Sequence, residues 1–410
     1  MSAASEVLPV RSDVAMIAFV GLAHAVSHFF HLVIPLLFPW LMPAFGLSYT
    51  QAGLLMTVFF IASGLGQALA GLVVDRVGSR PVLFFGLLLL AVSGVLLGIA
   101  QNYAMLMLSA TAAGIGNSVF HPADFALLNR QVGKPRLGHA FSVHGISGNL
   151  GWAAAPLVIT TVAAYAGWRS AAFSAGAIAL IPCALLYVLN AAVDGGQAAK
   201  EGSRQAEGSE TVSTLAVLRS PTVLLCFVFF FLISVAFGAL QNFSTSALKA
   251  VYALSLTGAA SCLSAYLFGT AAGIAAGGFL AARRAQELTI AVCICFAAAI
   301  SLVLASGVVA AAAVLPLMAL MGIGMGIAGP SRDLLIRRAS TQGLGAASYG
   351  RVYGFVYSGM DSGQAVAPLI FGTVMDGSHF TLLWVGIALF QGLAVLSALR
   401  VGRSVPAEGV

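Results

Sequence analysis

The chain has 410 residues, of which 60% are hydrophobic and only 8% are charged, with a formal net charge of +6. Soluble domains carry about 25% charged residues, so this composition excludes an ordinary soluble enzyme or binding module and indicates that most of the surface faces lipid. The basic residues lie in the polar breaks between apolar stretches and form no continuous basic surface, which argues against a nucleic-acid partner.

Apolar stretches long enough to cross a bilayer recur along the whole chain. A spanning helix needs about 20 such residues. Met1 to Asp13 is polar and has no small-residue cleavage site after it, so we expect the first helix itself to direct insertion. The sequence therefore predicts an all-α membrane protein with twelve transmembrane helices, near residues 14–38, 50–74, 81–100, 104–129, 138–162, 168–191, 221–246, 257–281, 287–307, 310–337, 350–374 and 380–400.

The longest polar stretch divides the chain into two parts. It predicts a solvated linker at 193–220 between a six-helix half at 1–192 and another at 221–410. Lys and Arg lie almost entirely in the linker, the termini and the loops on the same side, whereas the other side holds Arg169 and Lys249. The excess of basic residues on the cytoplasmic side of membrane proteins predicts a multi-pass protein of the cell inner membrane with both termini cytoplasmic.

An internal repeat relates the two halves. Gly114-Ile-Gly and the later Pro122 and Arg130 recur 208 residues further on, at Gly322-Ile-Gly, Pro330 and Arg338. Upstream matches, such as Leu47-Ser48-x-Thr50 with Leu254-Ser255-x-Thr257, keep an offset of 207, and downstream matches, such as Gly151 with Gly363, an offset of 212. Six helices per half make the repeats parallel, and transporters of this kind hold the substrate between the halves and work by alternating access.

The loop between the second and third expected helices carries a family motif. Gly71-Leu-Val-Val-Asp75-Arg76-Val-Gly78-Ser-Arg80 resembles the signature G-x-x-x-D-R-x-G-R-R of major facilitator superfamily transporters. The resemblance implies that Asp75, Arg76 and Arg80 belong to a cytoplasmic latch between the halves. In the second copy Ala282 stands where Asp75 stands in the first, so only the first copy should act as a charged latch.

Two short segments resemble a narrower group, the fosmidomycin-resistance-type exporters. They are Gly114-Ile-Gly with Phe120-His121-Pro122, and Ser142-x-His144-Gly145-x-x-Gly148-Asn149. Drug–proton antiporters often carry an Arg in the fourth helix, four residues before a Gly, but this chain has Ala110 at that place. The mechanism of those antiporters therefore does not transfer directly.

Ionisable residues at membrane depth are functional candidates because their burial costs several kcal/mol unless they are paired or hydrated. His24, His28 and His31 have the spacing i, i+4, i+7 and share one face of the first helix. We expect this stripe to line the cavity and to handle protons or substrate. One alternative is hydrogen-bonded packing between helices. The other is a transition-metal site of three imidazoles, and only this one is set aside, because no carboxylate or Cys shares the stripe.

Further polar residues lie inside the other expected helices. Asp361, at the position equivalent to Asn149 in the repeat, is predicted to couple transport to protons. Asp124 and Arg332, equivalent in the repeat, are predicted to form an inner gate. The alternative is that Arg332 pairs with Asp333 or a substrate anion, and Asp124 with Arg130 or water. The remaining candidates for proton coupling or for the substrate cavity are His121, His144, Asn149, Gln241, Asn242 and Gln364.

Taken together, these features predict a proton-coupled secondary transporter of a small organic molecule. The exporter resemblance favours efflux, and the alternative is an uptake symporter for an organic anion such as a carboxylate, held by Arg332 and the histidines. The sequence contains neither a P-loop nor a Ser-His-Asp arrangement that would indicate an enzyme. A sensor or membrane enzyme on the same scaffold is the third class. We expect no cofactor, no metal and no nucleic-acid partner. The expected partners are the substrate, protons and the lipid bilayer, and the expected oligomeric state is a monomer. All five cysteines lie inside apolar runs and predict no disulfide or zinc framework.

Overall fold

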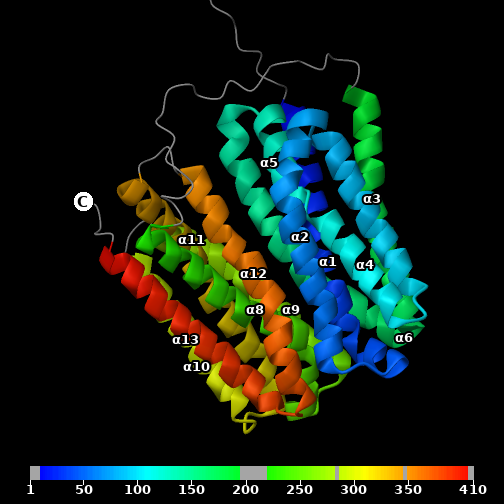
Figure 1. The fold of residues 1–410 in the computed structure, drawn as a ribbon, viewed down its shortest axis with the longest axis vertical. Helices are drawn as coiled ribbons and strands as arrows, with labels where there is room; N and C mark the ends of the chain where they lie inside the picture. The colour runs from blue at the N-terminus through cyan, green and yellow to red at the C-terminus, as the bar shows by residue number, and fades with distance from the viewer. Residues whose placement is uncertain (1–9, 194–218, 282–285, 345–348, 405–410) are drawn as a thin grey trace, which may run out of the picture. The chain divides into compact units, whose positions relative to one another are not determined.

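The computed structural model describes residues 10–193, 219–281, 286–344 and 349–404, and these residues are almost entirely α-helical (Figure 1). The part before the expected linker is built from α1 (Val10–Phe45), α2 (Tyr49–Val77), α3 (Ser79–Gly98), α4 (Tyr103–Asn117), α5 (Phe120–Gln131), the 3₁₀ turn η1 (Lys134–Arg136) and α6 (Leu137–Val193). The part after it is built from α8 (Pro221–Tyr252), α9 (Leu256–Ala281), α10 (Gln286–Ala305), α11 (Ala311–Leu344), α12 (Tyr349–Asp376) and α13 (Phe380–Ser404).

The helices agree with the twelve predicted spans. In the described residues, ten helical stretches are long and apolar enough to cross a membrane. One of them, α6, consists of two spans, because Gly167 has a non-helical backbone with φ 84° and reverses the chain. The remaining predicted span, 350–374, coincides with helix α12. α1 runs past the predicted end at residue 38, because Pro39 and Pro43 are accommodated and the helix stops only at Gly46, where φ is 64°.

The fourth predicted span, 104–129, is broken into α4 and α5. Pro122 has no N–H to donate to the carbonyl of Ser118, and its ring would clash with that carbonyl in a continuous helix. The chain therefore turns at Ser118 and Val119 before it resumes at Phe120. On the two sides of this break Asn117 and Asp124 are buried and His121 is half-buried.

Two compact units are found, Met1–Gly46 with Ile61–Gly196, and Leu47–Phe60 with Gln197–Val410. The change from one to the other along the chain falls within the expected linker 193–220, of which residues 194–218 lie outside the described part. Helix α2 is divided between the units, because its first turns pack on α12: the Thr57 hydroxyl donates to the carbonyl of Ala365 at 2.7 Å.

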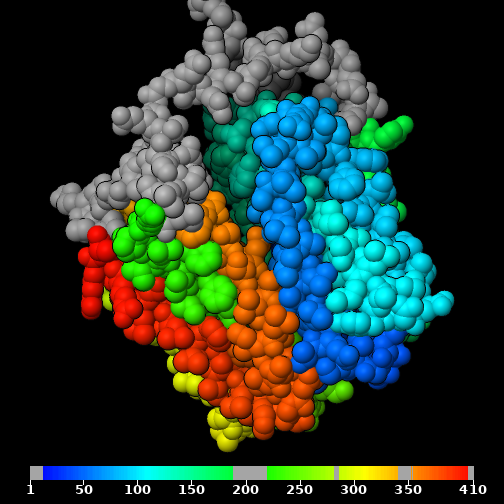
Figure 2. Space-filling view, viewed as in Figure 1, coloured from blue at the N-terminus to red at the C-terminus, as the bar shows by residue number. Residues whose placement is uncertain are grey.

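Glycines set the close approach of paired helices in each unit. In the first unit α1 packs along α6, and a Cβ at Gly151 would overlap the carbonyl of Ala25. In the second unit α9 packs along α11, where Gly322 and Gly326 face the carbonyls of Tyr266 and Thr270. Gly322 and Gly326 therefore serve the close packing of two helices. Helix α12 also lies against α8 and α13, as its orange surface beside the red of α13 shows (Figure 2).

Candidate functional site: a buried imidazole cluster

The histidine stripe of α1 lies inside the first unit. His24, His28 and His31 are 3%, 9% and 9% exposed, so each imidazole is almost fully enclosed by protein. The rings follow one another along the helix, with centroids 4.3 Å apart for His24 and His28 and 5.1 Å apart for His28 and His31. The sequence prediction that the three share one face is confirmed. The expectation that this face lines a substrate cavity stays a prediction.

Asn117, the last residue of α4, is the hydrogen-bonding centre at one end of the stripe. Its Oδ1 accepts from the Ser27 hydroxyl at 2.6 Å and lies 3.0 Å from Nε2 of His31. Its Nδ2 donates to the Ser63 hydroxyl of α2 at 2.8 Å. One amide therefore joins α1, α2 and α4 through three hydrogen bonds.

The tautomer of His31 follows from its two neighbours. The indole N–H of Trp152, on α6, donates to Nδ1 of His31 at 3.3 Å. Nδ1 must then carry the lone pair, and Nε2 carries the proton that it donates to Asn117. Both ring nitrogens of His31 are engaged, which leaves this residue as a packing and orienting group in the structure.

A carboxylate from α5 joins the cluster. Asp124 is fully buried, and its Oδ2 lies 3.0 Å from Nε2 of His144 on α6. The carbonyl of His144 in turn accepts from Nδ1 of His24 at 2.8 Å, and the two imidazoles stack with centroids 3.6 Å apart and planes 12° apart. His121, like His144 a separate candidate for proton coupling or for the substrate cavity, also contacts the stripe: its ring centroid lies 5.3 Å from that of His24.

The predicted gate residues each have a partner within one unit. Asp124 pairs with His144, as above. Arg332 on α11 donates to Asp333 at 2.9 Å and lies over the ring of Phe230 at 4.8 Å, and Tyr357 on α12 donates its hydroxyl to the same carboxylate at 3.1 Å. The alternative considered for Arg332, pairing with Asp333, is therefore present, and a pairing of Asp124 with Arg332 stays a prediction.

The candidates in the second unit form no comparable cluster among the described residues. Gln364 on α12 donates to Gln241 on α8 at 2.9 Å, and the Asn242 amide donates to the carbonyl of Gly238 at 2.7 Å. Asp361 is half-buried in the middle of α12, and in the described part of the chain it has no hydrogen-bond or ion-pair partner. Asn149, its repeat equivalent, donates to the carbonyl of Gly145 in its own helix at 3.0 Å.

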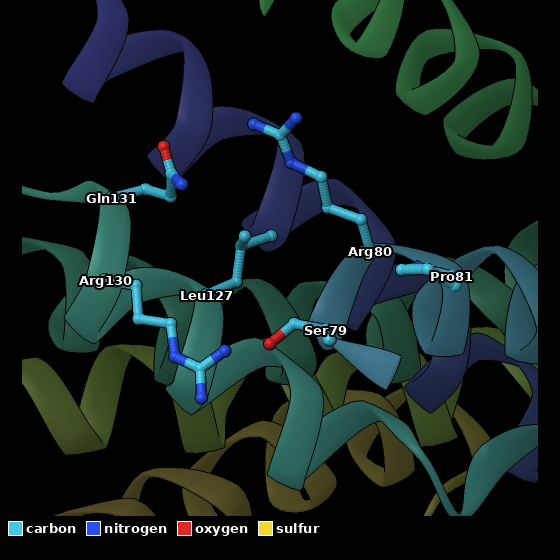
Figure 3. A pocket seen from close by; sticks show the side chains of 7 residues that line it. Ser79, Arg80, Pro81, Leu127, Arg130 and Gln131 are labelled. Carbon is cyan, nitrogen blue, oxygen red and sulfur yellow. The ribbon is translucent and has the colours of Figure 1, made fainter. Parts of the chain in front are cut away.

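The signature loop lies at one end of the first unit. Asp75 forms an ion pair with Arg130 of α5 at 3.9 Å, with both side chains more than half exposed, and Arg76 is exposed. Arg80 and Arg130 line a cavity of about 200 Å³ between the start of α3 and the end of α5 (Figure 3). The latch role of Asp75, Arg76 and Arg80 stays a prediction, because it concerns the approach of the two halves.

Several residues of the cluster were missed by sequence reasoning. Ser27, Ser63 and Trp152 are common residue types in membrane helices, and only the contacts above give them a role. Asp13 is also fully buried and pairs with Arg136 at 2.6 Å, which ties the start of α1 to the η1 turn. The polar stretch Met1 to Asp13 carries no sign of this burial.

The helical architecture is that of a multi-span membrane protein, and comparison with known proteins gives its class. The model of the Major Facilitator Superfamily matches residues 19–368, so the chain belongs to this superfamily. It is a transporter of small molecules, as members of the superfamily are.

Individual relatives are more distant. The chain is 26% identical to the fosmidomycin resistance protein of Escherichia coli (strain K12) over 279 residues, covering 67% of each protein. It is 31% identical over 153 residues to a probable 4-methylmuconolactone transporter of Cupriavidus pinatubonensis, covering 35% of this chain and 36% of that one. A crystal structure of a bacterial homologue of the human lysosomal transporter Spinster has the same fold, with a TM-score of 0.74, 13% identity and 96% coverage of both chains.

Proposed function

We propose that this protein is a proton-coupled secondary transporter that moves a small organic molecule across the inner membrane by alternating access, with both termini cytoplasmic. The proposed coupling of transport to protons rests on the position of Asp361. The similarity to the fosmidomycin resistance protein favours efflux, and the charge distribution of the loops supports the orientation.

Asp361 has the properties required of a proton-carrying group. It lies in the middle of α12, half-buried, with no partner among the described residues. An ionised carboxylate at membrane depth costs several kcal/mol unless it is paired or hydrated. A carboxylate of this kind can hold a proton when the protein encloses it and release the proton when water reaches it, which links proton movement to the conformational change.

An uptake symporter for an organic anion is the second candidate. It is supported by the similarity to the probable 4-methylmuconolactone transporter. The residue expected to bind a carboxylate was Arg332, which is paired with Asp333 in the structure. A substrate anion would therefore have to replace Asp333, and uptake is the less favoured direction.

The substrate and direction are tested first in cells. A deletion strain is screened against toxic compounds, fosmidomycin among them, and for growth on single organic acids as carbon source. Hypersensitivity of the deletion strain to one compound, reversed when the gene is put back, supports efflux. Loss of growth on one acid supports uptake. A compound found in this way is then used with purified protein in proteoliposomes.

Replacing Asp361 by Asn tests the coupling. Asp361→Asn should abolish transport driven by a pH gradient, because the amide cannot bind and release a proton, while exchange of substrate across the membrane continues. Glu287→Gln is the control, since Glu287 is a carboxylate already paired with Arg338 at 3.1 Å, and it should keep pH-driven transport. If a pH gradient drives Asp361→Asn as well as the wild type, Asp361 is not the coupling residue.

A further inference from the structure

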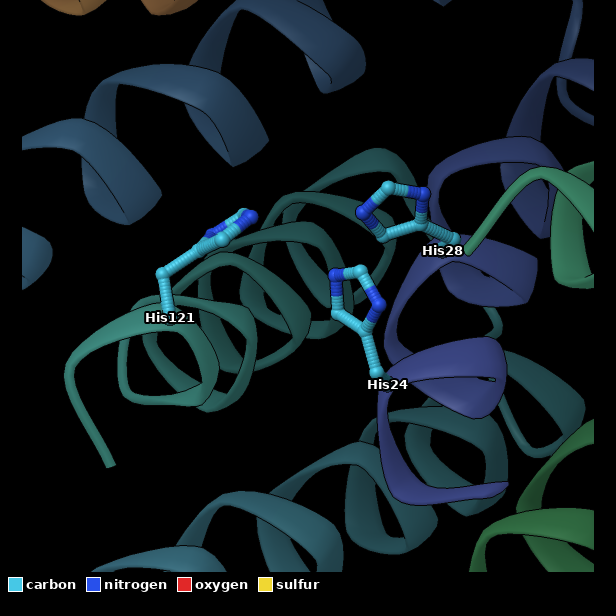
Figure 4. Close-up of side chains that lie close together, drawn as sticks. All are labelled: His24, His28 and His121. Carbon is cyan, nitrogen blue, oxygen red and sulfur yellow. The ribbon is translucent and has the colours of Figure 1, made fainter. Parts of the chain in front are cut away.

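Three imidazoles converge in the first unit from two helices. His24 and His28 extend from α1 and His121 from α5, and their rings point toward one another (Figure 4). One nitrogen of each ring lies within 4.8 Å of the corresponding nitrogens of the other two. Tetrahedral zinc, with Zn–N bonds near 2.0 Å, separates its nitrogen ligands by about 3.4 Å, so small rotations of these rings would bring the three nitrogens to that spacing.

The hydrogen bonds leave lone pairs available in the cluster. Nδ1 of His24 donates to the carbonyl of His144, and a carbonyl can only accept, so Nε2 of His24 carries a lone pair. This Nε2 and Nδ1 of His28 are both buried and have no hydrogen-bond partner in the described part of the chain. Metal-binding histidines commonly donate their second N–H to a backbone carbonyl, which is the arrangement of His24. His31 differs, because both its nitrogens are engaged.

A carboxylate is also within reach, which the first helix alone did not reveal. The ligand atoms of His24, Asp124 and His144 likewise lie within 4.8 Å of one another. Oδ2 of Asp124 is held by His144, whereas its Oδ1 is buried and has no hydrogen-bond partner in the described residues. The reason for setting a metal aside, the lack of a carboxylate on the histidine stripe, therefore no longer applies.

The backbone of α6 makes room for the imidazoles. A Cβ at Gly148 would lie 2.7 Å from Nδ1 of His28 and 2.8 Å from Cε1 of His24. Only a glycine leaves this space, because a real Cβ requires larger separations. A Cβ at Gly145, one turn earlier, would meet no side chain and no other helix within 4 Å among the described residues. The two glycines therefore form a matched pair for testing.

We propose that His24, His28 and His121 form a binding site for a divalent transition-metal ion such as Zn²⁺, and that Asp124, whose carboxylate lies within 4.8 Å of a ring nitrogen of His24, supplies the fourth ligand. Imidazole nitrogens suit zinc, cobalt, nickel and copper, whereas magnesium and calcium prefer all-oxygen sites. The ion joins α1 to α5. His121 is half-exposed, unlike the other two histidines, and gives the site its route of entry.

Metal binding by the purified full-length protein tests the proposal without any transport assay. Tag-free protein is freed of metal with a chelator and titrated with Co²⁺, whose visible absorption reports tetrahedral nitrogen coordination, and then with Zn²⁺ in competition with a chromophoric chelator. We expect one ion per chain, displacement of Co²⁺ by Zn²⁺, a higher Tm with Zn²⁺, and no effect of Mg²⁺ or Ca²⁺.

Variants locate the site. His24→Ala, His28→Ala and His121→Ala should each weaken Zn²⁺ binding at least about 10-fold, whereas a double His139→Ala, His379→Ala variant should bind like the wild type, because these two exposed histidines lie outside the cluster. Gly148→Ala should weaken binding and Gly145→Ala should not. Helical circular dichroism and gel filtration verify that each variant is folded.

Two results would overturn the proposal. One is an absence of saturable Zn²⁺ or Co²⁺ binding by the wild type. The other is binding at a different place. This would show as binding that persists in folded His24→Ala and Gly148→Ala proteins, or as binding that disappears in the His139→Ala, His379→Ala protein. Because the readout is metal binding, either result leaves the proposed proton-coupled transport unaffected, and failure of the Asp361 experiment leaves the metal site unaffected.

Discussion

At the scale of single residues, Asn117 shows how one side chain can organise three helices. Its amide oxygen faces the Ser27 hydroxyl and Nε2 of His31, and its nitrogen donates to Ser63. Asn117→Ala would leave the buried donors of Ser27 and His31 without an acceptor, at a cost of about 1–3 kcal/mol for each group. We expect a clearly lower Tm for the detergent-solubilised protein, measured by differential scanning fluorimetry with a dye for buried thiols.

Asn149→Ala is the matched control for Asn117→Ala. Asn149 is half-buried and donates only to the carbonyl of Gly145 in its own helix in the described hydrogen bonds. Its loss should change the free energy of unfolding by no more than about 0.5 kcal/mol. Equal Tm values for the two variants would show that the hydrogen bonds of Asn117 add nothing to stability.

At the scale of elements, the repeated Leu-Ser-x-Thr segments mark equivalent helix starts. Ser48 accepts from the N–H of Gln51 at 3.2 Å, and Gln51 accepts from the N–H of Ser48 at 3.0 Å, which is a capping box at the start of α2. Ser255 likewise accepts from the N–H of Gly258 at the start of α9. The repeat matches at these positions therefore reflect N-capping, a local requirement that both copies kept.

The start of α2 has an additional partner at the end of α12. Both carboxylate oxygens of Asp376 accept from α2, from the N–H of Tyr49 and from the N–H and hydroxyl of Thr50 at 2.5–3.1 Å. A carboxylate at a helix N-terminus is favourable because it satisfies free N–H groups and complements the helix dipole. Burial raises the pKa of Asp376, but these hydrogen bonds outweigh burial and leave its pKa below the usual value.

This pKa shift predicts a pH-dependent contribution to stability. A carboxyl group whose pKa is lower in the folded state stabilises that state above its unfolded pKa, near 3.8, and the contribution is lost as pH falls through the lower folded value. Asp376→Asn should therefore lower the Tm by about 1–2 °C near neutral pH, a small effect because the site is exposed. The difference from the wild type should shrink below pH 3.8. Asp75→Asn serves as control, and a difference that stays constant with pH would contradict the assignment.

At the scale of the whole molecule, α2 is shared between the two compact units. Leu47–Phe60 belongs with the second unit and the remainder of α2 with the first. A Cβ at Gly372 of α12 would lie 2.8 Å from the Cα of Thr50. If the two sequence repeats move against each other during transport, the first turns of α2 must leave α12 in part of the cycle.

A cross-link between these helices tests that movement. In a cysteine-free background, Thr50→Cys with Gly372→Cys should form a disulfide on oxidation and reduce transport at least about 10-fold, and reduction should restore it. The control pair, Gly21→Cys with Ser147→Cys, joins α1 to α6 within one unit, where a Cβ added at Gly21 would lie 3.6 Å from that of Ser147. This second disulfide should leave transport unchanged. A transporter that works equally well with the first disulfide closed does not separate α2 from α12.

The sequence by itself determined the properties that depend on local composition and periodicity. The spans, the repeat, the signature loop and the common face of His24, His28 and His31 follow from hydrophobic length, from residue spacing and from where glycine and proline stand, and the helices agree with them. Their physical basis is local, because a spanning helix satisfies its own backbone hydrogen bonds.

The tertiary structure decided which polar groups meet. Asp124 lies 100 residues from His24 along the chain, and the packing of α5 and α6 against α1 brings the two side chains together. The burial of Asp13, the role of Trp152 and the capping of α2 by Asp376 also depend on contacts between distant segments. Spacing along one helix specifies a face, but the neighbour of that face is set by packing between helices, which no single-helix pattern encodes.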